Sequence, residues 1–430
     1  MPVTIVLGGQ WGDEGKGKII DALASSADIV IRANGGANAG HTVVNDDGIF
    51  KFHLIPSGIL HPNCMCVVGA GVILDPAMVV QEIETLRKSG INPSNLRISS
   101  RAHVIMPYHP ALDQLQEDRL GEDKIGTTQR GMGPAYADKA SRTGIRVADI
   151  ADPEFLFQRL STVLEEKNNL LRTFYGHDGF DLNEVGERYA ALGEALRPYI
   201  TETEMLVQDA VQANREVLVE GAQAVMLDID YGSYPFVTSS SPTAAGVCQG
   251  AGVAPTQIDR VIGVYKAYTT RVGEGAFPTE LMDSTGDMIR ERGAEFGTTT
   301  GRPRRTGWFD AVQARYTARL NGVQEIALTK FDILDQLESI KIAVGYQLDG
   351  KRLDAPPASI HAYQKVEPIY ETHPGWMTDT TGMHSFHDLP PAAFAYIRRI
   401  EELIGIPVTF VGVGPHRKQL IDGKELRPTG

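Results

Sequence analysis

The first residues of the chain place a glycine-rich loop between an apolar strand and an amphipathic helix. The loop spans residues 8–18 and reads Gly-Gly-Gln-Trp-Gly-Asp-Glu-Gly-Lys-Gly-Lys. Its glycines let backbone N–H groups approach a ligand closely, and the N-terminus of the following helix adds partial positive charge. Two lysines supply full positive charge. This order of elements predicts a phosphate-binding loop, in preference to a tight turn that merely carries surface lysines.

The loop departs from the P-loop pattern at its last position. Residues 12–18 match up to the lysine, but Ile19 follows where a P-loop has a hydroxyl that ligates Mg²⁺. Asp13 is the candidate replacement because its carboxylate lies within the loop. The same carboxylate could also accept a proton from a substrate.

Composition narrows the class of protein. The 430 residues are 42% hydrophobic and 22% charged, which is typical of a globular protein with a sizeable core. A net charge of −13 argues against nucleic-acid or membrane partners. Only three cysteines are present, Cys64, Cys66 and Cys248, which indicates a reducing compartment. We expect no signal peptide before the first strand and no membrane span, and therefore a cytoplasmic protein.

Apolar β-rich segments alternate with helical patterns along the chain. This alternation predicts an α/β fold with a large, mainly parallel central sheet and helices on both faces, similar to P-loop NTPases. Strands are predicted at 3–8, 28–32, 66–74, 95–106, 216–220, 260–271, 325–329 and a last one at 407–411, helices at 15–26, 76–89, 309–320 and 391–404, and hairpins at 41–60 and 339–353. Residues 153–214 form a predicted helical subregion. No linker interrupts the pattern, so we expect residues 1–430 to form a single domain.

Three long segments interrupt the alternation, at residues 123–146, 228–252 and 272–308. They are rich in Gly, Thr, Ser and Arg, and long loops in a compact domain are usually functional. In a doubly wound sheet, loops at the carboxyl ends of the strands converge on a ligand crevice. We therefore expect these segments to surround the site.

His41 follows a run of small residues after the second predicted strand. An imidazole is suited to donate a proton or to stabilise charge that builds on an oxygen. A lone histidine is more often structural. Here the adjoining glycine-rich run, residues 33–40, favours the functional interpretation because it lets a ligand approach the backbone.

Lys330-Phe331-Asp332 ends another β-rich segment. In GTP-binding proteins a Lys-x-Asp at a strand end recognises guanine, because the carboxylate accepts hydrogen bonds from the ring N1–H and the exocyclic amine. Adenine has no N1–H, so an aspartate there disfavours ATP. The tripeptide alone is weak, but together with the phosphate loop it favours GTP.

The densest cationic patch spans residues 296–308 and contains Arg302, Arg304 and Arg305. Arginines grip carboxylate or phosphate groups through two parallel hydrogen bonds, and the neighbouring threonines add short donors. An RNA-binding or nuclear-localisation role is the alternative. It agrees poorly with the acidic chain and with the glycines and threonines around the patch.

Five segments together closely resemble the adenylosuccinate synthetase family. They are residues 10–18, 38–42, 125–136, 219–223 and 299–308, and the resemblance covers essentially the whole chain. It implies a purine-biosynthesis ligase that joins IMP and L-aspartate into adenylosuccinate while GTP is hydrolysed to GDP and phosphate, through a 6-phosphoryl-IMP intermediate. This is the first committed step from IMP to AMP. A regulatory GTP-binding switch is the alternative, but it would not need His41 or Gln223.

The resemblance also implies roles for individual residues. Asp13, His41 and Lys16 would be catalytic, and one Mg²⁺ per subunit would be held by Asp13 and the Gly40 carbonyl. The implied GTP site, for GTP as co-substrate, comprises Gly12, Asp13, Glu14, Gly15, Lys16, Gly17, Lys18, Gly40, His41, Thr42, Arg304, Lys330, Phe331, Asp332, Gly412, Val413 and Gly414. The implied IMP site comprises Asp13, Asn38, Ala39, Gly40, His41, Thr128, Arg142, Gln223, Thr238 and Arg302. L-Aspartate would be held by Thr298, Thr299, Thr300, Gly301 and Arg302.

Arg142 carries a further implication, because the family's corresponding arginine enters the neighbouring subunit's site and so implies a homodimer. The chain departs from the family pattern at two positions. Gln129 stands where the family often has glycine, beside the IMP-binding threonine. Gly412 replaces a common serine near the guanine, so only backbone contacts are expected there.

Overall fold

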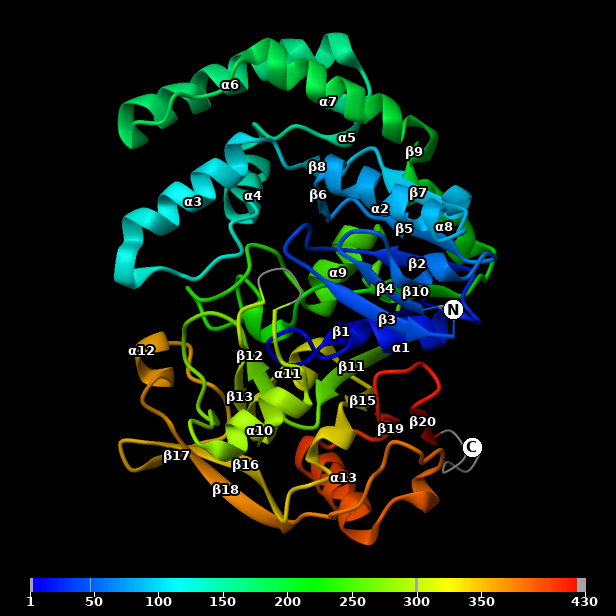
Figure 1. The fold of residues 1–430 in the computed structure, drawn as a ribbon, viewed down its shortest axis with the longest axis vertical. Coiled ribbons are helices and arrows are strands. Elements are labelled where there is room, and N and C mark those ends of the chain that lie inside the picture. The colour runs from blue at the N-terminus through cyan, green and yellow to red at the C-terminus, as the bar shows by residue number, and fades with distance from the viewer. Residues whose placement is uncertain (1–2, 47, 298–300, 424–430) are drawn as a thin grey trace.

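A ten-stranded sheet runs through the centre of the molecule (Figure 1). The computed structural model describes residues 3–46, 48–297 and 301–423. In spatial order the strands are β20 (Leu420–Asp422), β19 (Val408–Gly412), β15 (Glu325–Thr329), β11 (Arg260–Lys266), β1 (Val3–Gly8), β10 (Val217–Glu220), β2 (Ile29–Arg32), β5 (Met65–Val68), β7 (Leu96–Ser99) and β9 (Ile200–Thr201). Only β20 is antiparallel to its neighbour. The predicted, mainly parallel sheet is confirmed.

Helices cover both faces of this sheet, as the alternation along β1 requires. Ile5 packs into one hydrophobic core and its neighbour Val6 into the other. The first core takes side chains from α8 (Thr203–Gln212), α9 (Ala244–Ala251), α11 (Ala311–Asn321) and α13 (Pro391–Ile404), and the second from α1 (Lys16–Ala24), α2 (Pro76–Lys88), α6 (Pro153–Tyr175) and α7 (Leu182–Leu196). Figure 1 shows α6 and α7, in the predicted helical subregion, beyond the upper end of the sheet.

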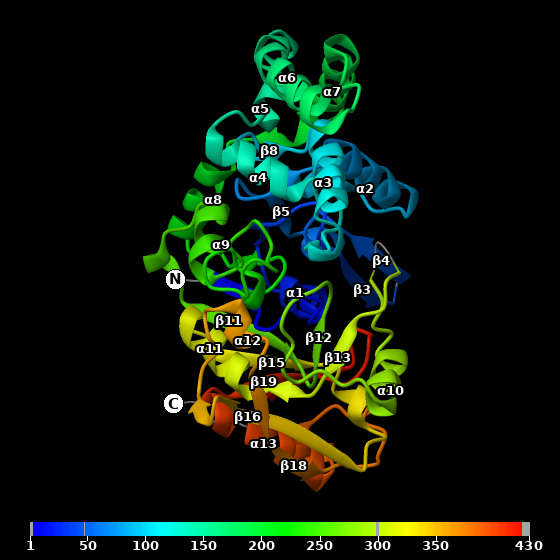
Figure 2. The same ribbon diagram turned by 90° about the vertical axis from the view of Figure 1, so that its left-hand side faces the viewer.

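A smaller sheet lies at the opposite end of the molecule (Figure 2). It contains β14 (Phe309–Asp310), β16 (Ser339–Leu348), β17 (Lys351–Leu353) and β18 (Glu367–Pro374). The predicted hairpin at 339–353 is confirmed as β16 and β17, whereas β18 was not predicted. The described residues also form three short two-stranded sheets: β3 (His41–Asn45) with β4 (Gly48–Phe52), β6 (Ile73–Leu74) with β8 (His103–Val104), and β12 (Thr269–Arg271) with β13 (Arg305–Gly307).

Several predicted boundaries are wrong. The strands predicted at 66–74, 95–106 and 260–271 are each divided in two, as β5 and β6, β7 and β8, and β11 and β12. After β5 the chain turns at Gly69 and Gly71, where an added Cβ would lie 2.6 Å from Gly250 O and 2.2 Å from Ala33 O, respectively. Glycines there let the chain leave the sheet beside α9. The hairpin at 41–60 is shorter than predicted, and β20 follows the strand predicted as the last.

The three segments predicted to be long loops each contain a helix, which corrects that expectation. These are α4 (Met132–Ser141), α9, and α10 (Ser284–Arg292). Helix α3 (Tyr108–Leu120), just before the first segment, was also not predicted. Within the described ranges no helix is long and apolar enough to cross a membrane.

The strand order reverses at β1. From β1 the chain proceeds through β2, β5 and β7 on one side, then returns through β10 to β11, β15 and β19 on the other. Ligands of open α/β sheets bind where the order reverses, outside the carboxyl ends of the strands. This topology places the loops after β1, β2, β10 and β15 around one position.

Helix α9 supports the loop after β2 through a close backbone contact. A Cβ added to Gly250 would lie 1.9 Å from the carbonyl oxygen of Ala33. Because the obstacle is backbone, rotation of a side chain cannot relieve it. Glycine is therefore required here, although alanine favours helices by about 1 kcal/mol.

We expect Gly250→Ala to lower the free energy of unfolding, because overpacking costs about 1–3 kcal/mol and exceeds the gain in helix propensity. Urea unfolding of the purified variant measures this. Gly382→Ala is the matched control, since nothing lies within 4 Å of its added Cβ. Equal midpoints for both variants would contradict the packing argument.

Candidate active site

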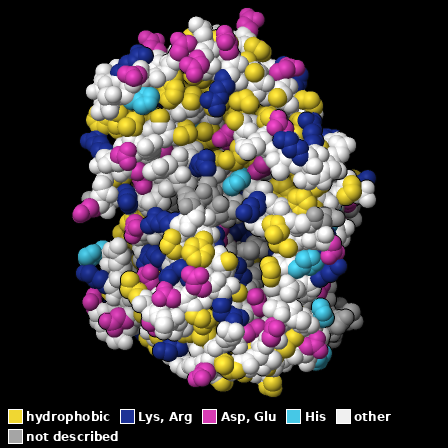
Figure 3. Space-filling model, in the orientation of Figure 1, with side chains coloured by type: hydrophobic (Ala, Val, Ile, Leu, Met, Phe, Trp, Pro, Cys, Tyr) yellow, Lys and Arg dark blue, Asp and Glu magenta, His cyan; other side chains and the backbone are white. Residues whose placement is uncertain are grey.

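Several of the expected site residues follow the carboxyl ends of parallel strands of the central sheet. The phosphate loop follows β1, the run ending at His41 follows β2, Gln223 follows β10, Lys330 follows β15, and Gly412 ends β19. Figure 3, drawn in the orientation of Figure 1, shows Lys and Arg side chains gathered across the middle of the face in view, between the upper and lower parts of the molecule. The sheet topology thus brings together segments that are far apart in sequence.

The phosphate loop is folded around the buried carboxylate of Glu14. Glu14 Oε1 accepts hydrogen bonds from the backbone N–H groups of Gln10 (3.1 Å) and Gly12 (2.8 Å), and its Oε2 accepts one from Lys16 Nζ (2.7 Å). Glu14 therefore points into the loop rather than out of it. Asp13 has the opposite exposure, with 32% of its side chain accessible, and its φ of 58° is left-handed. The loop thus presents one carboxylate and hides the other.

His41 lies against the loop, beside the first turn of α1. Its Cβ would be 3.2 Å from a Cβ built on Gly17. Nδ1 lies 3.4 Å from an Arg32 guanidinium nitrogen, which can only donate, so the neutral ring carries its proton on Nε2. Nε2 is buried and has no hydrogen-bond partner among the described residues. Burial lowers the pKa of His41 to about 4, against the opposing effect of Glu220, so the imidazole is neutral at pH 7.

A buried ion pair behind His41 was missed by the sequence analysis. Arg32 and Glu220 end β2 and β10 and are aligned partners across the two strands. Their side chains form a short hydrogen-bonded ion pair, and Ser57 N–H donates to the other Glu220 oxygen (3.2 Å). The available signal was a single charged residue at the end of each otherwise apolar strand.

Arg304 connects the cationic patch to the phosphate loop. Its Nε lies 2.8 Å from Asp13 Oδ2 as an ion pair, although the two groups are not aligned for a hydrogen bond. Its Nη1 donates to the buried Glu295 (2.6 Å). Arg302, in contrast, is half exposed and lies 3.3 Å from Glu274 Oε1. The expected aspartate-binding residues Thr298, Thr299 and Thr300 lie outside the described residues, and Gly301 beside them has a φ of 65°.

The predicted guanine motif, Lys330-Phe331-Asp332, follows a residue that contacts the phosphate loop. Thr329, the last residue of β15, donates from Oγ1 to the Glu14 carbonyl (2.5 Å). Lys330 follows with a left-handed φ of 52°, and burial raises the pKa of Asp332 to about 6. Residues 331–334 form a short 3₁₀ turn in which Phe331 is buried. The structure therefore joins two motifs that are separated by some three hundred residues in sequence.

The loop after β19 closes the other side of the guanine motif. Lys18 Nζ donates to the carbonyl oxygen of Gly414 (2.6 Å), and burial lowers the pKa of Lys18 to about 8. A Cβ on Gly412 would lie 3.5 Å from Lys18 Nζ, an ordinary contact, so a serine would fit where this chain has glycine. Val413 is buried.

Two of the expected IMP residues meet directly. Gln223, with a left-handed φ of 54°, donates from Nε2 to Asn38 Oδ1 (3.1 Å). Thr238 is partly buried, and its N–H donates to Leu227 O (2.8 Å).

Thr128 is exposed in a loop that two buried carboxylates of α3 hold in place. Glu117 accepts from the N–H groups of residues 125, 126 and 127, and Asp113 accepts from the Thr127 hydroxyl and from Gly131 N–H. Gln129 has a left-handed φ of 54°, which explains a preference for glycine at this position.

Arg142 lies apart from the other expected residues. It caps the C-terminus of α4 and is exposed, whereas Met132 at the start of α4 packs against Gly36 in the loop after β2. Ten helical residues span about 15 Å, so the helix carries Arg142 away from that loop.

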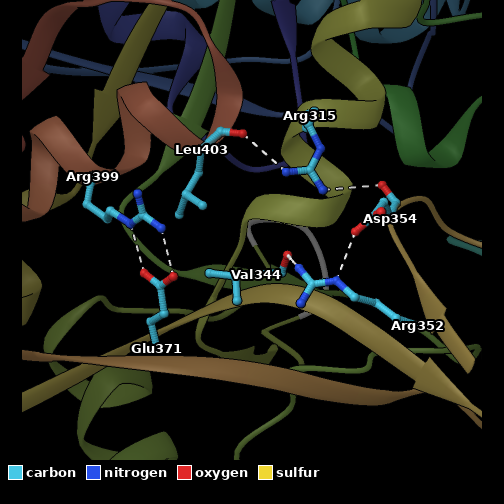
Figure 4. A pocket seen from close by; sticks show the side chains of 7 residues that line it. All are labelled: Arg315, Val344, Arg352, Asp354, Glu371, Arg399 and Leu403. Carbon is cyan, nitrogen blue, oxygen red and sulfur yellow. Dashed lines mark hydrogen bonds and ion pairs between the residues drawn. The ribbon is translucent and has the colours of Figure 1, made fainter. Parts of the chain in front are cut away.

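A cavity of about 440 Å³ lies elsewhere, between α11, α13 and the small sheet (Figure 4). None of the expected site residues lines it. Arg399 donates two hydrogen bonds to Glu371, and Arg352 donates one to Asp354. The charged side chains that line the cavity are therefore largely paired with one another.

Comparison with known proteins identifies the family. The adenylosuccinate synthetase family model matches residues 5–421. The chain belongs to the adenylosuccinate synthetase family. It is 60% identical to the adenylosuccinate synthetase of Thermomicrobium roseum, over 100% of this chain and 99% of that one, and 55% identical to that of Carboxydothermus hydrogenoformans, over 98% and 99%. The fully ligated adenylosuccinate synthetase of Plasmodium falciparum has the same fold, with a TM-score of 0.94 and 39% identity over 99% of this chain and 100% of that one.

Family membership establishes the reaction. The chain is a GTP-using ligase, EC 6.3.4.4, that converts IMP to adenylosuccinate in AMP biosynthesis. The alternative of a regulatory GTP-binding switch is thereby set aside.

If Asp332 binds guanine as the motif predicts, its raised pKa implies that guanine binding depends on pH. Its ionised form, present above about pH 6, is the form that accepts two hydrogen bonds. We expect GDP affinity, measured by calorimetry, to fall by up to about tenfold per pH unit below pH 6. Asp332→Asn is the control, because the phosphate groups of GDP still titrate with this variant but residue 332 does not. A pH profile identical in both proteins would remove Asp332 from the guanine site.

Proposed function

We propose that the residues converging outside β1, β2, β10 and β15 hold GTP, IMP and L-aspartate in one reacting arrangement. The observation that carries the proposal is the contact of the phosphate loop with both the guanine motif, through Thr329, and the cationic patch, through Arg304. Absorbance-monitored adenylosuccinate formation, with each substrate omitted in turn, tests it. Turnover without any one of the three would contradict it.

In the first step Asp13 acts as the general base. Its partly accessible carboxylate removes the N1 proton of IMP, which concentrates negative charge on O6. O6 then attacks the γ-phosphorus of GTP in line, the bond to the β–γ bridging oxygen breaks, and GDP and 6-phosphoryl-IMP result. Lys16 stabilises the transferring phosphoryl group. His41 supports the leaving side, because its unpartnered Nε2–H donates to the oxygen on which charge develops.

In the second step the amine of L-aspartate attacks C6 of 6-phosphoryl-IMP, and phosphate leaves. Thr298, Thr299, Thr300, Gly301 and Arg302 would hold the aspartate carboxylates. Asn38 and Gln223, which already contact each other, would hold IMP together with Thr128 and Thr238.

The residues present fit a Mg²⁺ ion. Among the described residues no three His, Cys, Asp or Glu side chains form a metal cluster, so a dedicated protein cage is not present. Mg²⁺ instead favours one or two carboxylates together with substrate phosphates and water. Asp13, the loop's accessible carboxylate, and the Gly40 carbonyl would supply such oxygen ligands. When bound, the ion would neutralise charge on the phosphates.

The position of Arg142 supports a homodimer in which each chain completes its partner's IMP site. An exposed arginine at the far end of α4 suits an interface better than the site of its own chain. We also propose that residues 1–430 act as one domain. A cytoplasmic location agrees with three free, buried cysteines.

We expect His41→Asn to bind IMP normally but to lose turnover, because Nε2 would act chiefly in the transition state. Asp13→Asn should lose at least the ~10²–10⁴-fold typical of a general base. Steady-state kinetics and IMP calorimetry measure both variants. A His41 variant with a raised KM and a normal kcat would make His41 a binding residue.

Mixing experiments test the shared site. Asp13→Ala and Arg142→Leu homodimers should each be inactive, but a mixed dimer contains one site with both residues intact. After complete subunit exchange, activity should return to about one quarter of wild type, since half of the dimers are mixed and each has one working site. Mass spectrometry verifies exchange. A fully exchanged mixture without activity would show that Arg142 does not act across the interface.

A further inference from the structure

Glu295 is a fully buried carboxylate at the base of the cationic patch. Its Oε1 accepts hydrogen bonds from Lys266 Nζ (2.9 Å), Tyr268 OH (2.6 Å) and Lys330 Nζ (2.8 Å). Its Oε2 accepts one from Arg304 Nη1 (2.6 Å). Burial alone would raise the pKa of Glu295, but Lys266, Lys330 and Arg304 together lower it below its usual range. The carboxylate is therefore ionised and is shared by three cations.

Two of these three cations are associated with strained backbone: Arg304 contacts a strained residue, and Lys330 is itself strained. Asp13 (φ 58°) lies 2.8 Å from Arg304 Nε, and Lys330 itself has a φ of 52°. A non-glycine residue in the left-handed region is strained and persists only where its surroundings enforce it. Asp13 is held by Arg304, which pairs with Glu295, and Lys330 pairs with Glu295 directly. These ion pairs are part of the surroundings that hold the two residues.

The backbone around Glu295 is fixed independently of its side chain. Its N–H donates to Arg290 O and its carbonyl accepts from Arg304 N–H, both at 2.9 Å. Lys330 Nζ also donates to Gly293 O (2.6 Å), two residues before Glu295. The side chain thus extends from a rigid base and can hold the guanine motif and Arg304 at a constant separation.

We propose that Glu295 is a positioning residue that couples guanine recognition at Lys330 to the orientation of Asp13 through Arg304. This inference rests on the proposed roles of Asp13 and Asp332. One carboxylate oxygen fixes the turn that presents Asp332 to the base, and the other fixes the arginine beside Asp13. Displacement at either end is transmitted through a single rigid group, so nucleotide recognition and proton abstraction depend on the same side chain.

Glu295→Gln tests the proposal because it retains the shape of the side chain and removes its charge. We expect the KM for GTP to rise and kcat to fall, each by about tenfold or more, the scale of losing a charge-assisted hydrogen bond. The preference for GTP over ITP, which lacks the exocyclic amine, should fall by a similar factor. The affinity for GDP, measured by calorimetry, should fall as well, and this measurement does not depend on turnover.

Two further variants make the test decisive. Glu280→Gln is the matched control, because Glu280 also grips an arginine of the patch, Arg305, but contacts neither Lys330 nor Arg304. The double variant Glu295→Gln with Lys266→Gln removes one buried cation together with the carboxylate. It is expected to fold even if the single variant does not, and to show the same loss of GTP preference.

Glu295 would be merely structural if Glu295→Gln, or the double variant with Lys266→Gln, is less stable but keeps the wild-type GTP-to-ITP preference and GDP affinity. This result would overturn the proposal. Failure of the proposed function has a different signature. In that case the wild-type protein itself would show no GTP preference, or Asp332→Asn would leave base choice unchanged.

Discussion

The parallel alignment of β1 with β10 and β11 is the constraint on which the site depends. Because these strands end together, the phosphate loop, Gln223 and the segment after Lys266 emerge at one edge of the sheet. The next strands outward add Arg32 and Lys330 to the same edge. Parallel strands buried on both faces must be apolar along their length, so charge can enter only at their ends. The charged side chains of these strands therefore gather at the edge of the sheet where the parallel strands end.

Charges brought together in this way must be neutralised within the protein, and the pairs that do so form the supporting structure of the site. Arg32 with Glu220 lies behind His41, and Glu295 lies behind Arg304 and Lys330. Removing one partner of a buried pair leaves an uncompensated charge and is strongly destabilising. The protein has a net charge of −13, yet it concentrates cations where we propose that phosphates bind. The buried carboxylates of Glu220 and Glu295 offset the repulsion among these cations.

Much of the fold could be predicted, and the errors have physical causes. Strand β15 and helix α13 match their predicted ranges to the residue, because an apolar run and an amphipathic repeat define them locally. The divided strands were missed because a β-rich composition does not show where glycines let the chain leave the sheet. Helices α4 and α9 were missed because small residues and glycines obscure a helical pattern, and α9 is stabilised by packing against β1 and β10.

The sequence by itself determined the mainly parallel sheet and the family, and it predicted the phosphate loop and the guanine motif, because these are carried by local patterns and short motifs along the chain. Only the tertiary structure decided which charges pair. Glu295 meets Lys266, Lys330 and Arg304 across separations of 29, 35 and 9 residues, and Arg32 meets Glu220 across 188. No local pattern encodes such pairings, because strand order and burial select the partners. For the same reason the inward-facing carboxylate of Glu14 and the unpartnered Nε2 of His41 became apparent only in the folded chain.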